Sequence, residues 1–342
     1  MNMKQWLAEV MASKTKRAMP ILSFPSTALL GVSVRELISS AALQAEGMKH
    51  VALRTDSLAS VSLMDLSVEA EAFGCPIKVS DGEVPTVTDR IVWEEEDADA
   101  LAIPEVGAGR TGLCIEAIRR ACAEITDRPV FAGVIGPYSL AGRLMDVSEI
   151  MILCYEEPDM VHTVMEKATT FLIDYMNAYK QTGACGVVVA EPLAGLLSPS
   201  LMEEFAAPYM KRIVDAVQTD DFLVIYHNCG NAVETLAEQI VTCGASAYHF
   251  GNACDMEKML ARMPSDTLVM GNIDPVGEFR GGTPESMRTA VLSLLARCSS
   301  YPNFVISSGC DIPPSAKWEN IDAFFAAVRE FYSALDAAVS KQ

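Results

Sequence analysis

Three residues that follow two apolar runs of this sequence have side chains that bind transition metals. His227 and Cys229 come directly after the run 222–226, and Cys310 follows the run 304–308. Residues two apart in a strand point to the same side. Imidazole nitrogen and thiolate sulfur are ligands that Zn²⁺ prefers, and three of them leave one tetrahedral position open to a substrate. The pattern leaves two alternatives open, a catalytic metal site or a core histidine with core cysteines.

Four more polar residues lie where other apolar runs end. Glu191 is either a polar residue of the rim or a group that hydrogen-bonds a metal ligand, accepts a proton or occupies the open zinc position. Glu191 and His249 are the candidate catalytic residues, although a core or supporting role is the leading interpretation for His249. Asn272 and Asp274 precede a proline, so a local turn is the leading interpretation; they are also the candidates for cofactor binding.

These side chains can meet only if the fold brings the ends of the runs together. The short apolar runs alternate with segments of helical periodicity and lie at 19–24, 50–54, 130–135, 186–190, 222–226, 246–250, 267–271 and 304–308. Continuous apolar character is typical of parallel strands that are buried on both faces. Eight such units predict one α/β domain over residues 1–342, a (β/α)8 TIM barrel whose chemistry lies at the C-terminal strand ends.

Two additions to the barrel are expected. Residues 4–16 have the pattern of an amphipathic N-terminal helix, and a helix that starts at Val34 should end at Gly47. The alternation breaks over residues 57–128, which we interpret as an insertion with short helices and a hairpin around Asp81-Gly82.

Composition excludes several classes of protein. The chain has 342 residues and a formal net charge of −19, which argues against binding to a nucleic-acid backbone. Its apolar runs are shorter than the roughly 18 residues that a membrane span needs. Ten cysteines without an export signal favour a reducing cytoplasm over a disulfide framework. The sequence also lacks a glycine-rich phosphate loop and a Gly-x-Ser-x-Gly nucleophile motif.

Taken together, the motifs resemble the uroporphyrinogen decarboxylase superfamily over nearly the whole chain. The supporting stretches are GVIGPYSLA at 133–141, LSP at 197–199 with Phe205 and Pro208-Tyr209, and GNIDP at 271–275. Within this superfamily the chain is similar to the zinc-dependent branch, the methylcobamide:coenzyme M methyltransferases. That similarity lies in DLSVEAEAFGC at 65–75, in the His-x-Cys pair, and in SSGCDIPP at 307–314, which contains Cys310.

The resemblance implies a barrel with Zn²⁺ bound by His227, Cys229 and Cys310. It implies transfer of a methyl group from methylcobalamin or another corrinoid, carried by a separate corrinoid protein, to a thiol such as coenzyme M. A pterin acceptor such as tetrahydrofolate is the closest alternative, and a non-catalytic zinc- or corrinoid-binding barrel is another. The decarboxylase needs arginines near the end of the first strand, and residues 24–30 contain none.

Overall fold

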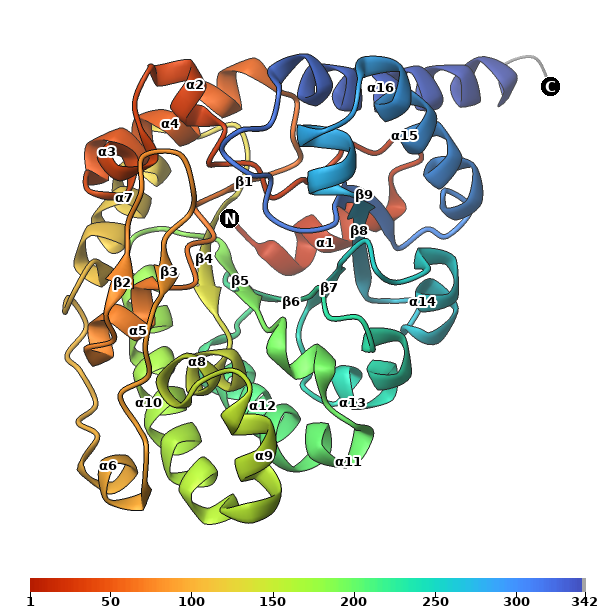
Figure 1. Cartoon of the computed structure of the whole chain (residues 1–342). Helices are drawn as coiled ribbons and strands as arrows, with labels where there is room; N and C mark the ends of the chain where they lie inside the picture. Colours follow the sequence, from red (N-terminus) through yellow and green to blue (C-terminus); the bar gives the residue numbers. More distant parts are fainter. Residues whose placement is uncertain (340–342) are drawn as a thin grey trace.

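The computed structural model describes residues 1–339, and its centre is a curled sheet of seven parallel strands (Figure 1). Neighbouring strands follow the order β1-β4-β5-β6-β7-β8-β9. Their bounds are β1 Ser60–Val61, β4 Val130–Ile135, β5 Gly186–Ala190, β6 Leu223–Asn228, β7 Ala247–Phe250, β8 Leu268–Ile273 and β9 Phe304–Ser308. This arrangement, with helices around the sheet, confirms the α/β barrel architecture.

An extended segment near the N-terminus lies in the gap between β9 and β1. The backbone N–H of Met19 donates to the carbonyl of Ile306 (3.0 Å), and Leu58 N–H donates to the carbonyl of Ala18 (2.7 Å). Pro20 interrupts the segment and has no N–H to donate, so a regular ladder cannot form there. The run 19–24 was predicted as a strand; it closes the barrel without forming one.

The prediction of a strand at 50–54 is wrong, because these residues complete a helix. Three helices precede β1, namely α2 Ser26–Leu30, α3 Val34–Ile38 and α4 Ala41–Arg54. Gly47 does not end a helix as expected. It lies inside α4, and a Cβ at this position would come within 2.6 Å of Ser26 Oγ. Gly47 therefore allows α2 and α4 to pack closely. The glycine that we expected to end a helix is instead needed for the contact between two helices.

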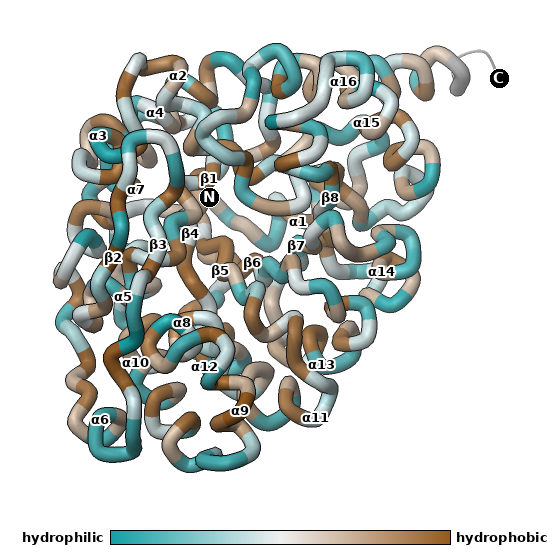
Figure 2. Tube along the Cα trace, in the orientation of Figure 1, coloured by the Kyte–Doolittle hydropathy of each residue, from teal (hydrophilic) through white to brown (hydrophobic). Residues whose placement is uncertain are grey.

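Helix α1 (Met3–Ala12) covers the end of the barrel at which the strands begin. Met3 and Leu7 pack with the apolar side chains that fill the barrel, and Met3 N–H donates to Asp220 O, just before β6 (2.7 Å). Figure 2 shows the apolar character of β4 and β5. The C-terminal strand ends face the opposite side, so that side is where a reactant can enter.

The remaining helices surround the sheet and link its strands. Their bounds are α7 Thr111–Glu124, α8 Pro137–Met145, α9 Glu149–Glu156, α10 Pro158–Lys180, η1 Leu193–Leu196, α11 Pro199–Leu201, η2 Met202–Ala206, α12 Ala207–Val217, η3 Val233–Leu236, α13 Ala237–Val241, α14 Met256–Arg262, η4 Pro275–Arg280, α15 Pro284–Cys298 and α16 Trp318–Val339. None of the helices within residues 1–339 combines the length and apolar character needed to cross a bilayer.

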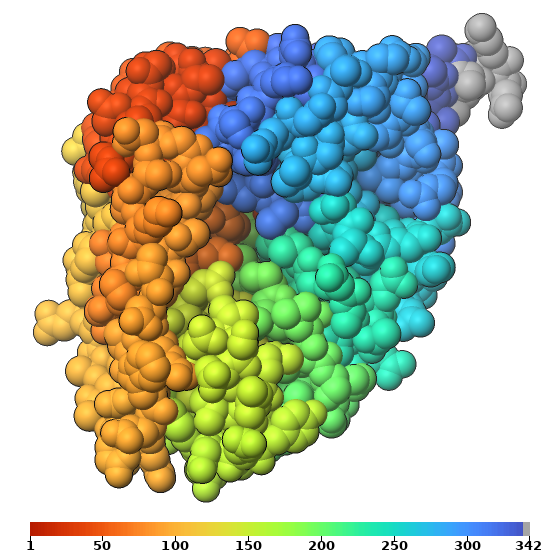
Figure 3. Space-filling model, viewed as in Figure 1, coloured from red at the N-terminus to blue at the C-terminus, as the bar shows by residue number. Residues whose placement is uncertain are grey.

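The segment between β1 and β4 contains the expected hairpin. Strands β2 (Ile77–Lys78) and β3 (Thr86–Val87) pair antiparallel, between the short helices α5 (Val68–Phe73) and α6 (Glu95–Ala100). Ser60–Val61 falls within the segment 57–128 that we interpreted as an insertion, yet it pairs with β4 in the barrel. Figure 3 shows that residues around the hairpin border one side of a hollow in the face of the molecule.

Candidate metal centre

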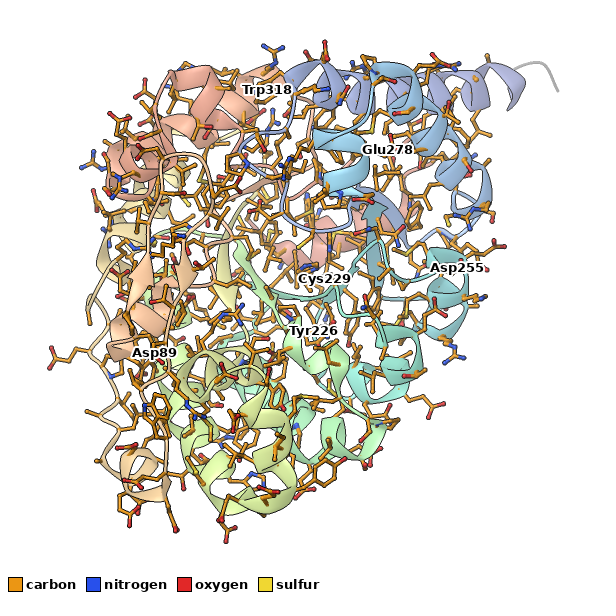
Figure 4. All side chains as sticks on the ribbon, viewed as in Figure 1. Asp89, Tyr226, Cys229, Asp255, Glu278 and Trp318 are labelled. Carbon is orange, nitrogen blue, oxygen red and sulfur yellow. The ribbon has the colours of Figure 1, made fainter. Side chains whose placement is uncertain are left out.

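Three donor atoms from two strand ends meet in the mouth of the barrel. They are His227 Nε2, Cys229 Sγ and Cys310 Sγ, which we call the donor triangle, and all lie within 4.8 Å of one another. Figure 4 shows Cys229 beside β6 and β7. His227 is the penultimate residue of β6 and lies on the inner side of the sheet, and Cys310 follows β9. The structure thus brings together all three residues that the sequence predicted as ligands.

The spacing of the donor triangle fits a zinc ion. Tetrahedral Zn²⁺, with bonds of about 2.3 Å to sulfur and about 2.0 Å to nitrogen, holds two sulfurs about 3.8 Å apart and sulfur and nitrogen about 3.5 Å apart. Cys310 Sγ lies 3.9 Å from Cys229 Sγ and 3.4 Å from His227 Nε2. The chain would therefore need little rearrangement to bind the ion, with the fourth position left to a ligand from the mouth.

A chain of hydrogen bonds behind His227 defines its tautomer. Ser307 Oγ donates to the carbonyl of Met19 (2.7 Å), so it can accept from His249 Nε2 (2.7 Å). His249 Nδ1 then has a lone pair that faces His227 Nδ1 at 2.8 Å, which places the proton of His227 on Nδ1. The Nε2 lone pair of His227 therefore faces the sulfurs of Cys229 and Cys310. Burial, and then the neighbouring His227, hold the pKa of His249 well below its ordinary value, so His249 is neutral.

The two thiols of the donor triangle are unequal. Cys310 donates to Cys229, which lowers the pKa of the Cys229 thiol. The same hydrogen bond, together with burial, raises the pKa of Cys310 to about 12. Cys229 is thus the first of the pair to become a thiolate, the form that binds metals.

A close approach of two backbones fixes Cys229. A Cβ at Gly251, directly after β7, would lie 2.5 Å from the Cβ of Cys229 and 2.6 Å from its Cα. Only glycine leaves Cys229 in this position, so Gly251 is part of the support of the site.

Glu191, a candidate catalytic residue, lies away from the donor triangle. Ala190 pairs with His227 inside the barrel, so the next residue points to the outer side. The Glu191 carboxylate accepts hydrogen bonds from the N–H groups of Tyr138 (3.0 Å) and Ser139 (2.6 Å) in the first turn of α8. Its side chain is fully buried, and burial raises its pKa to about 7. The geometry is that of a helix cap, since carboxylates stabilise helix N-termini.

The two candidate cofactor-binding residues also have local partners. The Asn272 amide donates to the carbonyls of Gly251 and Cys254, both at 2.9 Å. Asp274 Oδ1 accepts from the N–H groups of Val276 and Gly277 and so caps η4. Asn272 supports the loop that carries Gly251, and Asp274 makes the turn that the sequence favoured.

Several charged residues of the mouth were missed from the sequence. Asp311, next to Cys310, has a buried Oδ1 without a hydrogen-bond partner within the described chain, and burial raises its pKa well above the ordinary value. Arg110 donates to Asp65, Glu71 and Ser67. Asp65 stands in a stretch that carried the resemblance, but no local pattern connects it with Arg110, which is 45 residues away.

Comparisons with known proteins identify the family of this chain. A sequence model described as uroporphyrinogen decarboxylase (URO-D) matches residues 15–331. The methylcobamide:CoM methyltransferase MtbA of Methanosarcina mazei is 31% identical over 235 residues, which are 68% of each chain. Uroporphyrinogen decarboxylase of Pseudomonas fluorescens is 27% identical over 80% of this chain and 78% of its own.

A solved structure gives the same picture of the fold. A methyltransferase from Methanosarcina mazei superposes with a TM-score of 0.85 at 22% identity, covering 96% of this chain and 98% of its own. The resemblance stated from the motifs is confirmed by the family match, which spans most of the sequence. The chain belongs to the uroporphyrinogen decarboxylase family.

Proposed function

We propose that this protein is a zinc-dependent methyltransferase that moves a methyl group from a methylcobamide to a thiol. The observation that carries the proposal is the donor triangle, because a His/Cys/Cys set with one open position suits activation of a thiol. Relatives named methylcobamide:CoM methyltransferase, at 31% and 29% identity, supply the donor and the class of acceptor.

The protein's own residues would bind and orient the reactants. His227 presents the Nε2 lone pair that its hydrogen bonds to His249 and Ser307 maintain. Cys229 and Cys310 supply two thiolates and so bring the charge of the occupied site near zero. When bound, Zn²⁺ would hold the acceptor as a thiolate and keep its sulfur nucleophilic at neutral pH.

The mouth of the barrel suits a large methyl donor and the protein that carries it. Several large apolar side chains are exposed on segments that follow strand ends or belong to the insertion: Trp93, Val147, Ile152, Tyr155, Leu196 and Val276. Exposed apolar groups around a polar site are typical of a surface that another protein covers. We propose that the corrinoid protein docks on this side, so that the methyl–cobalt bond reaches the thiolate sulfur.

Methylcobalamin is the donor with which to test this proposal. Mixed with the zinc-loaded enzyme and coenzyme M without oxygen, it should lose its methyl group to the thiol, and the corrin spectrum should change to that of Co(I). His227→Ala should abolish the reaction. Cys298→Ala, a cysteine buried in α15 away from the triangle, should leave it intact.

Two other outcomes would redirect the proposal. Methylation of tetrahydrofolate, with no reaction of thiols, would show that the acceptor is wrong. Release of CO₂ from uroporphyrinogen, with no methyl transfer, would favour the decarboxylase reaction for which other relatives are named.

A further inference from the structure

A cavity of about 310 Å³ opens beside the hairpin and outside the donor triangle. Its walls come from residues 85–90, from the two residues 66–67 after β1, and from the C-terminal part of α8 with the turn that follows it. Figure 4 labels one of its lining residues, Asp89, between the hairpin and α8. The volume suits a small molecule or one group of a larger one.

Arg143 of α8 lines this cavity without an ion-pair partner among the described residues. Within residues 1–339 its guanidinium has no hydrogen bond or ion pair, and burial lowers its pKa. The other arginines of the described chain that are buried or half-buried all have a carboxylate partner: Arg90, Arg110, Arg128 and Arg288. A cation removed from water without a partner is unfavourable, and an anion that enters the cavity would relieve this.

A second cation is already held in place on the same wall. Arg90 Nη1 donates to the carbonyl of Met145 (3.2 Å), and its guanidinium carbon lies 3.9 Å from the ring centroid of Trp93. The nearest carboxylate oxygen, from Glu149, is 3.7 Å away, at the long end of an ion pair. Arg90 therefore keeps part of its hydrogen-bonding capacity for a ligand.

Two carboxylates on the cavity wall limit the charge of that ligand. Asp146 Oδ1 accepts from the N–H groups of Ser148 (2.8 Å) and Glu149 (3.2 Å), and Asp89 Oδ1 accepts from Arg90 N–H (2.9 Å). With Arg90 and Arg143 they make the formal side-chain charge of the lining zero. One negative charge can pair with Arg143, whereas each carboxylate repels a dianion about twice as strongly as a monoanion.

The cavity shares the barrel mouth with the donor triangle. Ser67 lines the cavity and donates to Asp65 Oδ1 (2.6 Å). Asp65 is in turn close enough to Asp311 for the two carboxylates to repel each other, and Asp311 follows Cys310. Ser67, Asp65 and Asp311 thus connect the cavity wall with the residue that follows Cys310.

We propose that Arg143, supported by Arg90, binds a singly charged oxyanion group of a reactant. That the group belongs to a reactant rests on the proposed function. Two sources share this chemistry: a sulfonate or carboxylate on the thiol acceptor, and the phosphodiester of the donor's nucleotide loop. In each case the anion replaces water at Arg143 and orients the molecule that carries it.

Equilibrium binding tests the site without any methyl transfer. Calorimetry with ethanesulfonate and with dimethyl phosphate should show binding of at least one to the wild-type protein. Arg143→Gln should weaken it about tenfold to a hundredfold, since hydrogen bonds to charged groups are lost. Arg143→Lys should weaken it less, because the charge stays. Arg212→Gln, an exposed arginine paired with Glu166, is the matched control and should bind as the wild type does.

Thermal unfolding separates a binding role from a purely structural one. The bound anion should raise the unfolding temperature of the wild type and not that of Arg143→Gln. Without anion, the substitution removes an unpaired, half-buried cation and should leave the unfolding temperature the same or higher. Equal binding by wild type and Arg143→Gln, or binding by neither, would overturn the proposal.

Steady-state kinetics identify which reactant carries the anion. If it is the acceptor, Arg143→Gln should raise the KM for coenzyme M and leave that for uncharged 2-mercaptoethanol unchanged. If it is the donor, the KM should rise for methylcobalamin and not for methylcobinamide, which lacks the nucleotide phosphodiester. An equal change for charged and uncharged partners would contradict the assignment to a reactant. Anion binding without methyl transfer would refute the proposed function alone.

Discussion

The buried carboxylate of Glu191 should make the stability of the barrel depend on pH. Glu191 is fully buried, and burial raises its pKa from 4.5 to about 7 despite two hydrogen bonds from backbone N–H groups of α8. The folded protein therefore binds a proton at this residue over a range of pH in which the unfolded chain has released it. Glu191→Gln removes the titration while preserving the shape of the side chain.

The sign and size of the effect follow from linkage. Because the folded pKa is raised, the stabilising contribution of Glu191 is complete below about pH 4.5 and is lost as the pH rises through about 7. Between pH 5 and pH 8 the wild type should lose about 2.5 kcal/mol of unfolding free energy relative to Glu191→Gln. The glutamine carries a constant penalty of about 1–3 kcal/mol, since its amide cannot accept from both N–H groups.

Urea unfolding of both proteins, metal-free, at pH 5, 6, 7 and 8 measures this difference. Glu285→Gln, whose side chain is 80% exposed, controls for the loss of one negative charge. A constant difference between wild type and Glu191→Gln across this range would refute the assignment of Glu191 as a buried helix cap. The zinc content of Glu191→Gln is a separate test: if it equals that of the wild type, Glu191 is not a zinc ligand.

Three further substitutions test how the site and the fold are supported. His249→Phe should leave the barrel folded and weaken zinc binding about tenfold to a hundredfold in competition with a chelator, because His227 loses its tautomer-fixing partner; unchanged affinity would contradict the hydrogen-bond chain. Gly251→Ala should weaken zinc binding at least about tenfold, because the new Cβ would lie 2.5 Å from the Cβ of Cys229 and displace that residue. Gly82→Ala is the control, since the space around Gly82 is open, and it should leave zinc binding unchanged. Gly47→Ala should destabilise the protein by about 1–3 kcal/mol in urea unfolding, because the new Cβ meets Ser26, even though alanine favours helices. The double variant Gly47→Ala, Ser26→Ala should recover part of this loss. A gain in stability from Gly47→Ala alone would refute the packing argument.

The parts of the fold that follow from local pattern could be predicted from the sequence. The runs 130–135, 186–190 and 304–308 are strands as expected, because their continuous apolar character requires burial on both faces. Residues 50–54 were predicted wrongly. Helix α4 continues past Gly47 for a reason that lies in a neighbouring helix, and nothing local signals it.

In the candidate site, too, some residues could be predicted from local pattern and others depend on tertiary contacts. His227 and Cys229 follow from the two-residue period of a strand, and Cys310 follows once the barrel is expected to close. The partners behind them depend on which face each residue takes. Glu191 directly follows Ala190, the residue of β5 that pairs with His227, so its side chain points to the opposite side, toward α8. Ser307 contacts His249, and Arg143 lines a cavity with residues 66–67 and 85–90; these neighbours are distant in the sequence, so no local pattern indicates either role.

X-ray absorption at the zinc edge tests the central claim most directly. The resting enzyme should show two sulfur ligands at about 2.3 Å and one imidazole nitrogen at about 2.0 Å, with a light atom completing the set. Addition of coenzyme M should raise the sulfur count to three, and Cys310→Ala should lower the count or empty the site. An unchanged sulfur count with saturating thiol, or full zinc occupancy in Cys310→Ala, would contradict the account.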